Sequence, residues 1–289
     1  MKTLVIDGNN LIHRTYWTAK TQSKRTDTDT LDQLSNFHIY FTLNAVYSYV
    51  AKFTPTRTIF IWDEKPDYQK NDRKLQFEDY KGNRSGDPSP HQNNETIKQL
   101  LSYLGIASIF PRELEADDIA AYICKQTEGQ KVIVSVDKDF LQLIQPEVIL
   151  YDPIRKTEYR YDTFEDQTGW SVDNWLVAKC CMGDKSDNVP GLVKFGNSKI
   201  KKFISGEIVL TDEQQEIYSR NYSLFSLDAI MQKAEEQEYY KQQLSVPVNT
   251  NWSAFVEECN KRQFNAILKK KEAWHTLFFL TAKLSSIFG

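Results

Sequence analysis

Long apolar segments are missing from this chain of 289 residues, and no run approaches the roughly 18 consecutive apolar residues that a membrane span requires. The sequence opens on Met-Lys-Thr-Leu-Val-Ile-Asp, which is typical of a strand and leaves no room for a signal peptide. We therefore expect a cytoplasmic protein that has no membrane partner.

Cysteine is scarce too, and the four cysteines are Cys124, Cys180, Cys181 and Cys259. They form no C-x-x-C pair and the four histidines complete no metal pattern, which excludes a structural zinc site and a disulfide framework. Glycine and proline are sparse, with 11 and 9 residues, beside 15 tyrosines and 16 phenylalanines. This balance favours long helices over a β-sandwich.

Three short apolar segments, at residues 3–6, 58–62 and 131–136, are predicted to be buried strands separated by helical patterns. The alternation predicts an α/β fold with a mostly parallel central sheet and helices on both faces. The three strands lead into Asp7, Asp63 and Asp137. Because ligands of open α/β sheets bind at the carboxyl ends of the strands, these acids mark the candidate site.

The remaining segments suggest two regions. Residues 18–32 are polar and are predicted to form a mobile loop. Residues 64–90 carry mixed charges and form either a disordered connection or a helical flap over the crevice. From about residue 170 onward the pattern is helical. We therefore predict an α/β core at 1–182, with the insertion at about 64–90, and a helical C-terminal region at 183–289.

Six further acids lie in three short motifs: Glu115, Asp117 and Asp118 at the start of a predicted helix, Asp139 after the third strand, and Asp184 and Asp187 between helices. Each motif alone has a structural explanation as a cap, a turn or a solvated acid. Together they would repel, by about 4 kcal/mol for two charges ~4 Å apart at an effective dielectric constant of ~20. Bound cations would relieve this repulsion, and oxygen ligands without His or Cys favour Mg²⁺ or Mn²⁺. Such ions can assist an in-line phosphoryl displacement by water.

The net charge of −3 is unusual for a protein that binds nucleic acid. If the nine carboxylates belong to a metal site, the rest of the chain carries a net charge of +6. The acidity of the whole chain is therefore compatible with a basic binding surface.

The order and spacing of these motifs resemble the 5′-nuclease (flap endonuclease) superfamily, and in particular its phage branch, which includes the RNase H of T-even bacteriophages. The 5′-nuclease domain of bacterial DNA polymerase I is similar too. The resemblance covers roughly residues 2–205. The matching residues are Ile6-Asp7-Gly8-Asn9-Asn10-Leu11, Arg14, Asp63, Asp79-Tyr80-Lys81-Gly82-Asn83-Arg84, Glu115-Ala116-Asp117-Asp118, Asp137-Lys138-Asp139-Phe140 and Met182-Gly183-Asp184-Lys185-Ser186-Asp187-Asn188-Val189.

The resemblance implies two Mg²⁺ ions, for which Mn²⁺ can substitute. Asp7, Asp63, Glu115, Asp117 and Asp118 match the acids on one side of the cluster, and Asp137, Asp139, Asp184 and Asp187 match those on the other. No carboxylate position is missing. This favours a catalytic protein over a non-catalytic branched-DNA binding protein of the same fold.

The resemblance also assigns roles to basic and aromatic residues. Lys81 is expected to stabilise the charge on the scissile phosphate, Arg84 to help hold the substrate, and Arg14 to contact a phosphate near the metals. Tyr68 and Tyr80 either stack on an unpaired base or pack inside the protein. Residues 64–90 correspond to the helical arch of the family, through which a 5′ single strand is thought to pass.

After Asn188 the family carries a helix-hairpin-helix element that grips duplex phosphates. Gly191 and Gly196 match it, whereas Lys194 stands at a usual glycine and Ser198 at a usual basic position, which leaves the K⁺ site of that element open. Phosphate contacts are still expected from the basic residues of this stretch, which are Lys194, Lys199, Lys201 and Lys202.

The expected reaction is metal-dependent hydrolysis of phosphodiester bonds in DNA and RNA/DNA duplexes near 5′ ends and flaps. A toxin-type small ribonuclease is a rival, but such small domains lack the arch and the Gly-Asp-Lys-Ser-Asp-Asn motif. We expect a monomer, in the host cytoplasm if phage-encoded, with a sliding clamp or a single-strand binding protein as partners. The apolar segment containing Ile287 and Phe288 is either the last turn of a packed helix or a clamp-binding peptide.

Overall fold

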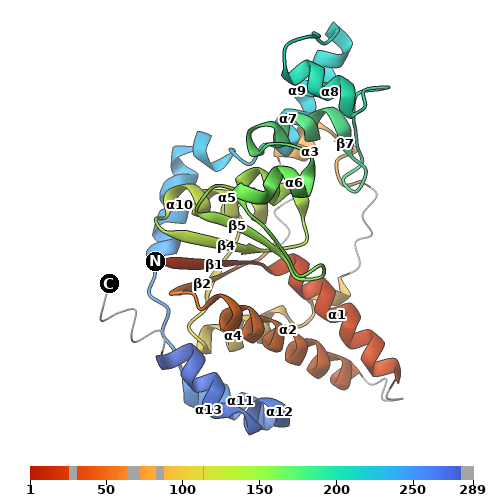
Figure 1. The fold of residues 1–289 in the computed structure, drawn as a ribbon. Helices are drawn as coiled ribbons and strands as arrows, with labels where there is room; N and C mark the ends of the chain where they lie inside the picture. Colours follow the sequence, from red (N-terminus) through yellow and green to blue (C-terminus); the bar gives the residue numbers. More distant parts are fainter. Residues whose placement is uncertain (26–30, 64–71, 83–87, 113, 281–289) are drawn as a thin grey trace.

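A six-stranded sheet lies at the centre of the computed structural model, which describes residues 1–25, 31–63, 72–82, 88–112 and 114–280 (Figure 1). The strand order is β3-β2-β1-β4-β5-β6, and only β6 runs antiparallel to its neighbour. The predicted mostly parallel sheet is thus confirmed. The strands are β1 (Lys2–Asp7), β2 (Arg57–Ile61), β3 (Ala107–Ile109), β4 (Gln130–Val134), β5 (Val148–Asp152) and β6 (Thr157–Tyr159).

Helices cover both faces of this sheet, as predicted. The helical elements up to residue 182 are α1 (Gly8–Arg25), α2 (Leu31–Phe53), α3 (Asp72–Gln76), η1 (Ser89–His91), α4 (Asn94–Tyr103), α5 (Ala116–Gln126), η2 (Lys138–Leu143), η3 (Tyr161–Thr163), α6 (Phe164–Thr168) and α7 (Val172–Met182). A short ribbon of β7 (Gly183–Asp184) and β8 (Val189–Pro190) follows. The later elements are α8 (Asn197–Ile204), α9 (Asp212–Phe225), η4 (Ile230–Gln232), α10 (Ala234–Ser245), α11 (Trp252–Lys261), α12 (Asn265–Lys269), α13 (Lys271–His275) and η5 (Thr276–Leu280).

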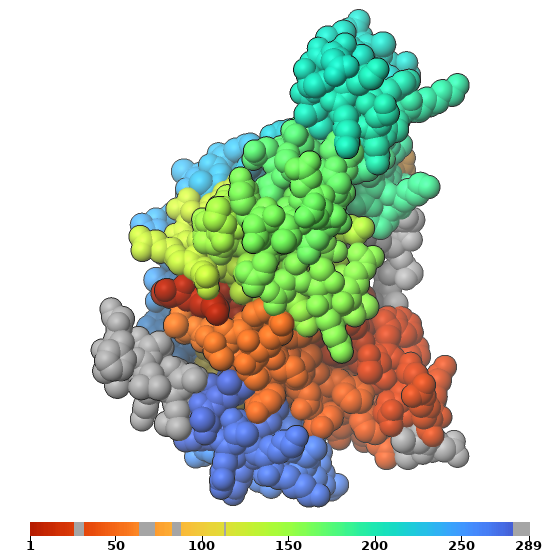
Figure 2. Space-filling model, in the orientation of Figure 1, coloured from red at the N-terminus to blue at the C-terminus, as the bar shows by residue number. Residues whose placement is uncertain are grey.

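Alternate side chains of the strands feed two separate hydrophobic clusters. Val5 and Ile133 point into the cluster formed with α5, α7 and α10, whereas Leu4 and Val132 point into the cluster formed with α1, α2 and α4. Helices α11–α13 join the second cluster through residues such as Trp274. The C-terminal region therefore packs against both faces of the core, while α8 and α9 project from the body (Figures 1 and 2).

The predicted mobile loop at residues 18–32 is largely wrong, because α1 continues to Arg25 and α2 begins at Leu31. Two threonines of α1 satisfy their hydroxyls inside the helix: Thr18 donates to the carbonyl of Arg14 (2.8 Å) and Thr21 to that of Trp17 (2.9 Å). Residues 26–30 lie outside the described part. A polar sequence is thus compatible with helix when its hydroxyls find a carbonyl one turn back.

The inserted segment at 64–90 is described only at residues 72–82 and 88–90. Within it lie the short helix α3 and the start of η1. Arg84 and Tyr68 fall outside the described residues, as does the predicted clamp-binding segment. None of the helices in the described ranges is long and apolar enough to cross a membrane. All four cysteines are free and buried, as expected.

One buried histidine ties α1, α2 and the N-terminus of α4 together beside the sheet. His38 on α2 donates from Nε2 to the carbonyl of Ile12 (3.1 Å), and its Nδ1 accepts from the amide of Asn93 (3.1 Å). The second bond requires the neutral ring, because a protonated Nδ1 cannot accept. Burial lowers the pKa of His38 to about 4.

We predict that His38 makes the fold acid-labile. The unfolded chain takes up a proton near pH 6.5 but the folded protein only near pH 4, so stability is present above pH 6.5 and is lost as the pH falls. The loss between pH 7 and pH 4.5 should be about 2–3 kcal/mol in urea unfolding. His38→Gln should lower stability at pH 7 but remove this part of the pH dependence, whereas the control His275→Gln should keep it. Parallel pH profiles for wild type and His38→Gln would contradict the assignment.

Candidate active site

A cleft of about 400 Å³ lies at the carboxyl ends of the central strands. Its lining residues are Asp7, Asn9, Asn10, His13, Asp63, Lys81, Glu115, Ala116, Asp117 and Asp137. Five of the nine predicted carboxylates are among them, with Lys81 as the one lysine or arginine in the lining. The three strand-end acids Asp7, Asp63 and Asp137 thus lie in one cleft, as the sequence predicts.

Ser135 links the acids of neighbouring strands. Its hydroxyl donates to Oδ2 of Asp7 (2.5 Å) at the end of β1 and accepts from the backbone amide of Asp137 (3.0 Å) after β4. The other oxygen of Asp7 accepts from the amide of Asn10 (3.0 Å) in the first turn of α1. Sequence reasoning missed Ser135, although a serine two residues before a strand-end aspartate is a usable signal.

The start of α5 carries Glu115, Asp117 and Asp118, as the sequence predicts. Asp117 and Glu115 line the cleft, but Asp118 does not. Asp118 is fully buried, and its carboxylate accepts from the backbone amide of Glu115 (3.2 Å). Asp118 therefore lies inside the protein, whereas Glu115 and Asp117 reach the cleft.

Arg73 of α3, which the sequence analysis did not single out, holds Asp118. Its two terminal nitrogens donate to the two oxygens of Asp118 (2.8 and 2.7 Å), and Nη1 also contacts Oε2 of Glu115 (3.0 Å). Nε donates to the carbonyl of Leu224 (2.8 Å). Since both oxygens of Asp118 face this guanidinium, the expectation that Asp118 ligates a metal directly is not supported. Nothing in the surrounding sequence marks Arg73.

Lys81 reaches the same oxygen of Glu115 from the cleft side. Its Nζ lies 2.8 Å from Oε2, which also accepts from the hydroxyl of Tyr80 (3.1 Å). Burial and the neighbouring carboxylate of Glu115 act in opposite directions on the pKa of Lys81, and the carboxylate prevails, so that pKa lies above its usual value. The lysine therefore stays charged.

Tyr80 is packed, which corrects its assignment as a nucleic-acid-binding residue. Only 4% of it is exposed, and its ring lies in a small cluster with Val189, Leu224 and Phe225. A buried ring cannot stack on a base, so the alternative of a packed tyrosine is the one observed.

A second group of acids lies around Lys179, which is buried on α7. Its ammonium forms ion pairs with Asp139 and with Asp184, the latter at 3.1 Å. Burial alone would raise the pKa of Asp184, but the hydrogen bonds from Ser186 and the charge of Lys179 outweigh it and lower that pKa. Asp187, also buried, lies in the same loop, where its carbonyl accepts from the amide of Lys81 (2.9 Å). Sequence reasoning missed Lys179, although a lysine inside an apolar helix is a signal.

The acids that line the cleft, which we call the first group, have in contrast an excess of negative charge. Burial, reinforced by Asp137 and Asp63, raises the pKa of Asp7 to about 6. Burial and the same neighbour, Asp137, raise the pKa of Asp117 well above its usual value. Burial and mutual repulsion thus disfavour the charged forms of both acids, a cost that a nearby cation would offset.

A family model named 5′-3′ exonuclease, N-terminal resolvase-like domain matches residues 2–169, which is more than half of the chain. The chain belongs to this family. The 5′-3′ exonuclease of Buchnera aphidicola subsp. Schizaphis graminum is 27% identical over 198 residues, which are 67% of this chain and 66% of that protein. The flap endonuclease Xni of Shewanella sp. strain W3-18-1 is 28% identical over 199 residues, which are 68% of this chain and 71% of that protein. The chain thus spans about two thirds of the length of these relatives.

The fold is also that of a solved nuclease. The bacteriophage T5 D15 protein co-crystallized with metal ions superposes with a TM-score of 0.65 and 19% identity, over 84% of this chain and 98% of that one. At this identity the match carries the fold alone. Together with the family model, it confirms the predicted 5′-nuclease superfamily and the expected nuclease function. The narrower phage branch stays a prediction.

The predicted duplex-binding element of this nuclease lies between α7 and α8. Gly191 is required there because a Cβ would lie 2.2 Å from the carbonyl oxygen of Met182. Lys194, at a usual glycine position, has φ of 55°, the left-handed conformation that glycine favours. Lys199, Lys201 and Lys202 are exposed on α8.

Arg14, on α1, donates to the hydroxyl of Tyr49, and this hydrogen bond fixes the direction of the arginine side chain.

We predict that Arg73 and Asp118 are strongly coupled in stability. Arg73→Met should cost about 3–5 kcal/mol in urea unfolding without metal, because it removes the guanidinium that pairs both oxygens of the buried Asp118, while Glu115 keeps Lys81 as its partner. Adding Asp118→Asn should recover part of that loss, since one buried charge disappears.

The matched control is the surface pair Arg160–Glu158, in which Arg160→Met should cost under about 1 kcal/mol. Additive losses for Arg73→Met and Asp118→Asn would show that the pair is not coupled.

Proposed function

We propose that this nuclease hydrolyses phosphodiester bonds near 5′ ends and flap junctions of DNA, including RNA primers on DNA, with two Mg²⁺ ions. The observation that carries the proposal is the composition of the cleft: five carboxylates line about 400 Å³ with one ammonium among them. Such an arrangement is stable only with bound cations or with protonated acids. Burial, together with Asp137 and Asp63, raises the pKa of Asp7, and a bound cation would act in the opposite direction.

The donor set fits a hard divalent cation. All candidate ligands are carboxylate oxygens, and among the described residues no three acidic, His or Cys side chains converge tightly enough to enclose an ion. Mg²⁺ keeps several of its waters and is usually held by one or two carboxylates, so an open set of acids suits it. Mn²⁺ shares these preferences.

We assign one ion to Asp7, Asp63, Glu115 and Asp117, with Asp118 supporting them through Arg73 and the backbone. The second ion is assigned to Asp137, Asp139, Asp184 and Asp187. The T5 D15 flap endonuclease has been solved in a complex with DNA and metal ions, and the T5 5′-exonuclease with divalent metal ions (zinc), which supports both DNA and a divalent metal here. When bound, the ions would activate the attacking water and stabilise the leaving oxygen.

The residues of the chain supply positioning and charge. Lys81 places an ammonium at the cleft, where it can contact a non-bridging oxygen of the scissile phosphate. Glu115 orients that ammonium at 2.8 Å, and Arg73 holds Glu115 from behind at 3.0 Å. Ser135 keeps Asp7 and Asp137 in fixed relation. Arg14 and Arg84 are proposed to hold neighbouring phosphates.

Duplex DNA is proposed to bind at α8 and the loop before it. A Cβ on Gly196 would meet nothing within 4 Å, so no neighbouring residue requires a glycine at this position. Close approach of a phosphate backbone would explain it. Lys194 adopts the left-handed backbone conformation at a position where the family's K⁺ site usually has glycine. K⁺ binding therefore stays a prediction. The sliding clamp, the single-strand binding protein and the monomeric state also stay predictions.

The central test is Mg²⁺-dependent cleavage of a 5′-labelled flap beside single-stranded and blunt duplex controls. Wild type should cut near the junction, and Asp137→Asn or Asp184→Asn should lower turnover by more than about tenfold, or ~1.4 kcal/mol. The control Asp162→Asn, at an exposed acid on η3, should cut like wild type.

Each variant should still bind the flap in Ca²⁺. Near-normal turnover of Asp184→Asn would contradict the two-ion assignment. Binding without any cleavage by wild type would instead favour a non-catalytic branched-DNA binding protein.

The duplex site is tested by replacing Lys194, Lys199, Lys201 and Lys202 together with alanine. Affinity for duplex-bearing substrates should fall, and the slope of log K against log salt should flatten by up to about 0.9 per lost phosphate contact. The matched control replaces four exposed lysines elsewhere, which are Lys241, Lys269, Lys270 and Lys271. Equal salt slopes for both quadruple variants would place the duplex elsewhere.

A further inference from the structure

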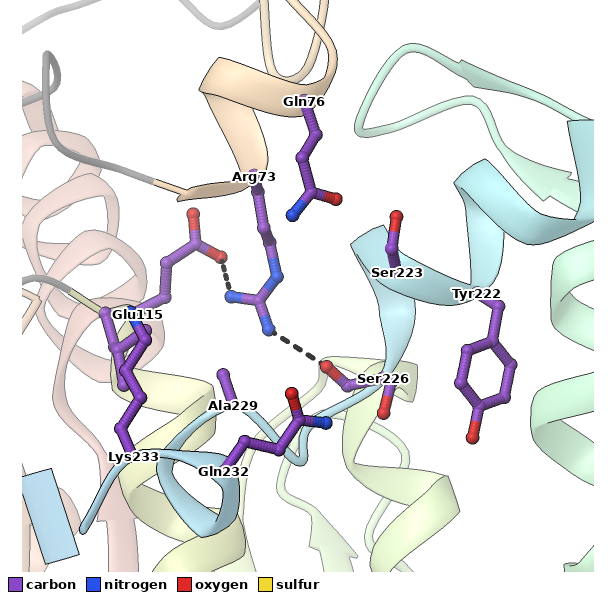
Figure 3. Close-up of a pocket in the computed structure, with 10 residues that line it drawn as sticks. Arg73, Gln76, Glu115, Tyr222, Ser223, Ser226, Ala229, Gln232 and Lys233 are labelled. Atoms are coloured by element: carbon purple, nitrogen blue, oxygen red, sulfur yellow. Dashed lines mark hydrogen bonds and ion pairs between the residues drawn. The ribbon is translucent and has the colours of Figure 1, made fainter. Parts of the chain in front are cut away.

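A second cavity, of about 240 Å³, shares Glu115 with the catalytic cleft, and Figure 3 shows the residues that line it. It is formed by α3, by the end of α9 and by η4 with the residue after it. The lining residues are Arg73, Gln76, Leu114, Glu115, Tyr222, Ser223, Ser226, Ala229, Gln232 and Lys233. Apart from Glu115 and Arg73, the polar residues of this cavity have no role in the proposed metal or duplex sites.

The wall between cavity and cleft is a single row of charged groups. Oε2 of Glu115 accepts from Arg73 on the cavity side (3.0 Å) and from Lys81 on the cleft side (2.8 Å). Consecutive nucleotides along one strand are about 3.4 Å apart when stacked and farther apart when extended. A strand whose phosphate contacts Lys81 therefore needs only about one or two further nucleotides to reach the cavity.

The side chains of the cavity suit a nucleotide. Tyr222 of α9 lines the cavity and is 43% exposed, and its ring lies beside that of Tyr218, with 6.4 Å between the centroids. Gln76 enters from α3 and Gln232 from η4 (Figure 3), and neither amide forms a hydrogen bond with the described residues. Each amide has both a donor and an acceptor and can rotate, so the pair can match the edge of any base. Lys233 adds a positive charge on the same side as Glu115.

We propose that this cavity binds one unpaired nucleotide of the 5′ single strand, next to the scissile phosphate, with its base stacked on Tyr222. The inference rests on the proposed function, since that function brings a 5′ strand to the cleft. A base inside the cavity cannot remain in a duplex stack, so the nucleotide must belong to the single-stranded part. Stacking tolerates any sequence, as a general nuclease requires.

The test combines Tyr222→Ala with flaps that carry one abasic residue at each successive position from the cleavage site. For wild type, kcat/KM should fall about tenfold at one abasic position only. Tyr222→Ala should lower kcat/KM by a similar factor on the flap that has all its bases. An abasic residue at the sensitive position should then cause no further loss, because base and ring act as one unit. Equal abasic losses in wild type and Tyr222→Ala would overturn the proposal.

The control variant is Tyr161→Ala, which removes a tyrosine of similar exposure (51%) from η3. It should match wild type on every flap. If Tyr161→Ala loses activity like Tyr222→Ala, the effect belongs to a general loss of surface aromatics and the subsite is rejected.

A binding measurement separates this inference from the proposed function. A flap that carries 2-aminopurine at the position sensitive to the abasic residue is mixed with the protein in Ca²⁺. If the protein shows no cleavage, so that no sensitive position is known, 2-aminopurine is placed at each position in turn. Wild type should quench its fluorescence at one position, and Tyr222→Ala should not. Quenching without cleavage in Mg²⁺ would retain the subsite and reject the nuclease assignment. Cleavage without position-specific quenching would retain the nuclease assignment and reject the subsite.

Discussion

One carboxylate oxygen, Oε2 of Glu115, connects the parts of this site. It accepts hydrogen bonds from Arg73, Tyr80 and Lys81, which come from the inserted segment, while Glu115 itself begins α5. A buried carboxylate is tolerated only with such partners, and each buried cation in turn depends on the acid. The insertion is thereby fastened to the core, and the ammonium of Lys81 is directed at the cleft. The same contact forms the wall between the cleft and the cavity behind it.

The two groups of acids differ in how their charge is balanced. Around Asp139 and Asp184 the buried ammonium of Lys179 already neutralises part of the charge. Around Asp7 and Asp117 burial and mutual repulsion raise the pKa values instead. In the second group a cation must therefore compete with the ammonium of Lys179, whereas the acids around Asp7 and Asp117 have only Lys81 as a lysine or arginine in the lining of their cleft. The two metal positions are for this reason expected to differ in affinity, with the tighter site beside Asp7.

The acids of the cleft could be predicted from the sequence because the topology itself brings strand ends together. A parallel sheet places the residues after β1, β2 and β4 at one edge, whatever the rest of the chain does. Arg73, Lys179 and Ser135 could not be predicted in this way, since each contacts an acid at least 40 positions away. The correction at Tyr80 and the different position of Asp118 have one cause: a motif identifies residues but not the direction of their side chains. At residues 18–25 the polar composition concealed threonine hydroxyls that bond within the helix.

Helix α9 shows why the region after residue 182 cannot be treated as an appendage. Asn221 donates to the carbonyls of Cys180 (2.8 Å) and Pro190 (2.9 Å), on either side of the loop that carries Asp184 and Asp187. The next turn supplies the carbonyl of Leu224 to Arg73 (2.8 Å). One short stretch of α9 thus supports the second acidic group directly and the first through Arg73 and Glu115. Tyr222 lies within that stretch, so a nucleotide stacked on its ring would contact the element that holds both groups of acids in place.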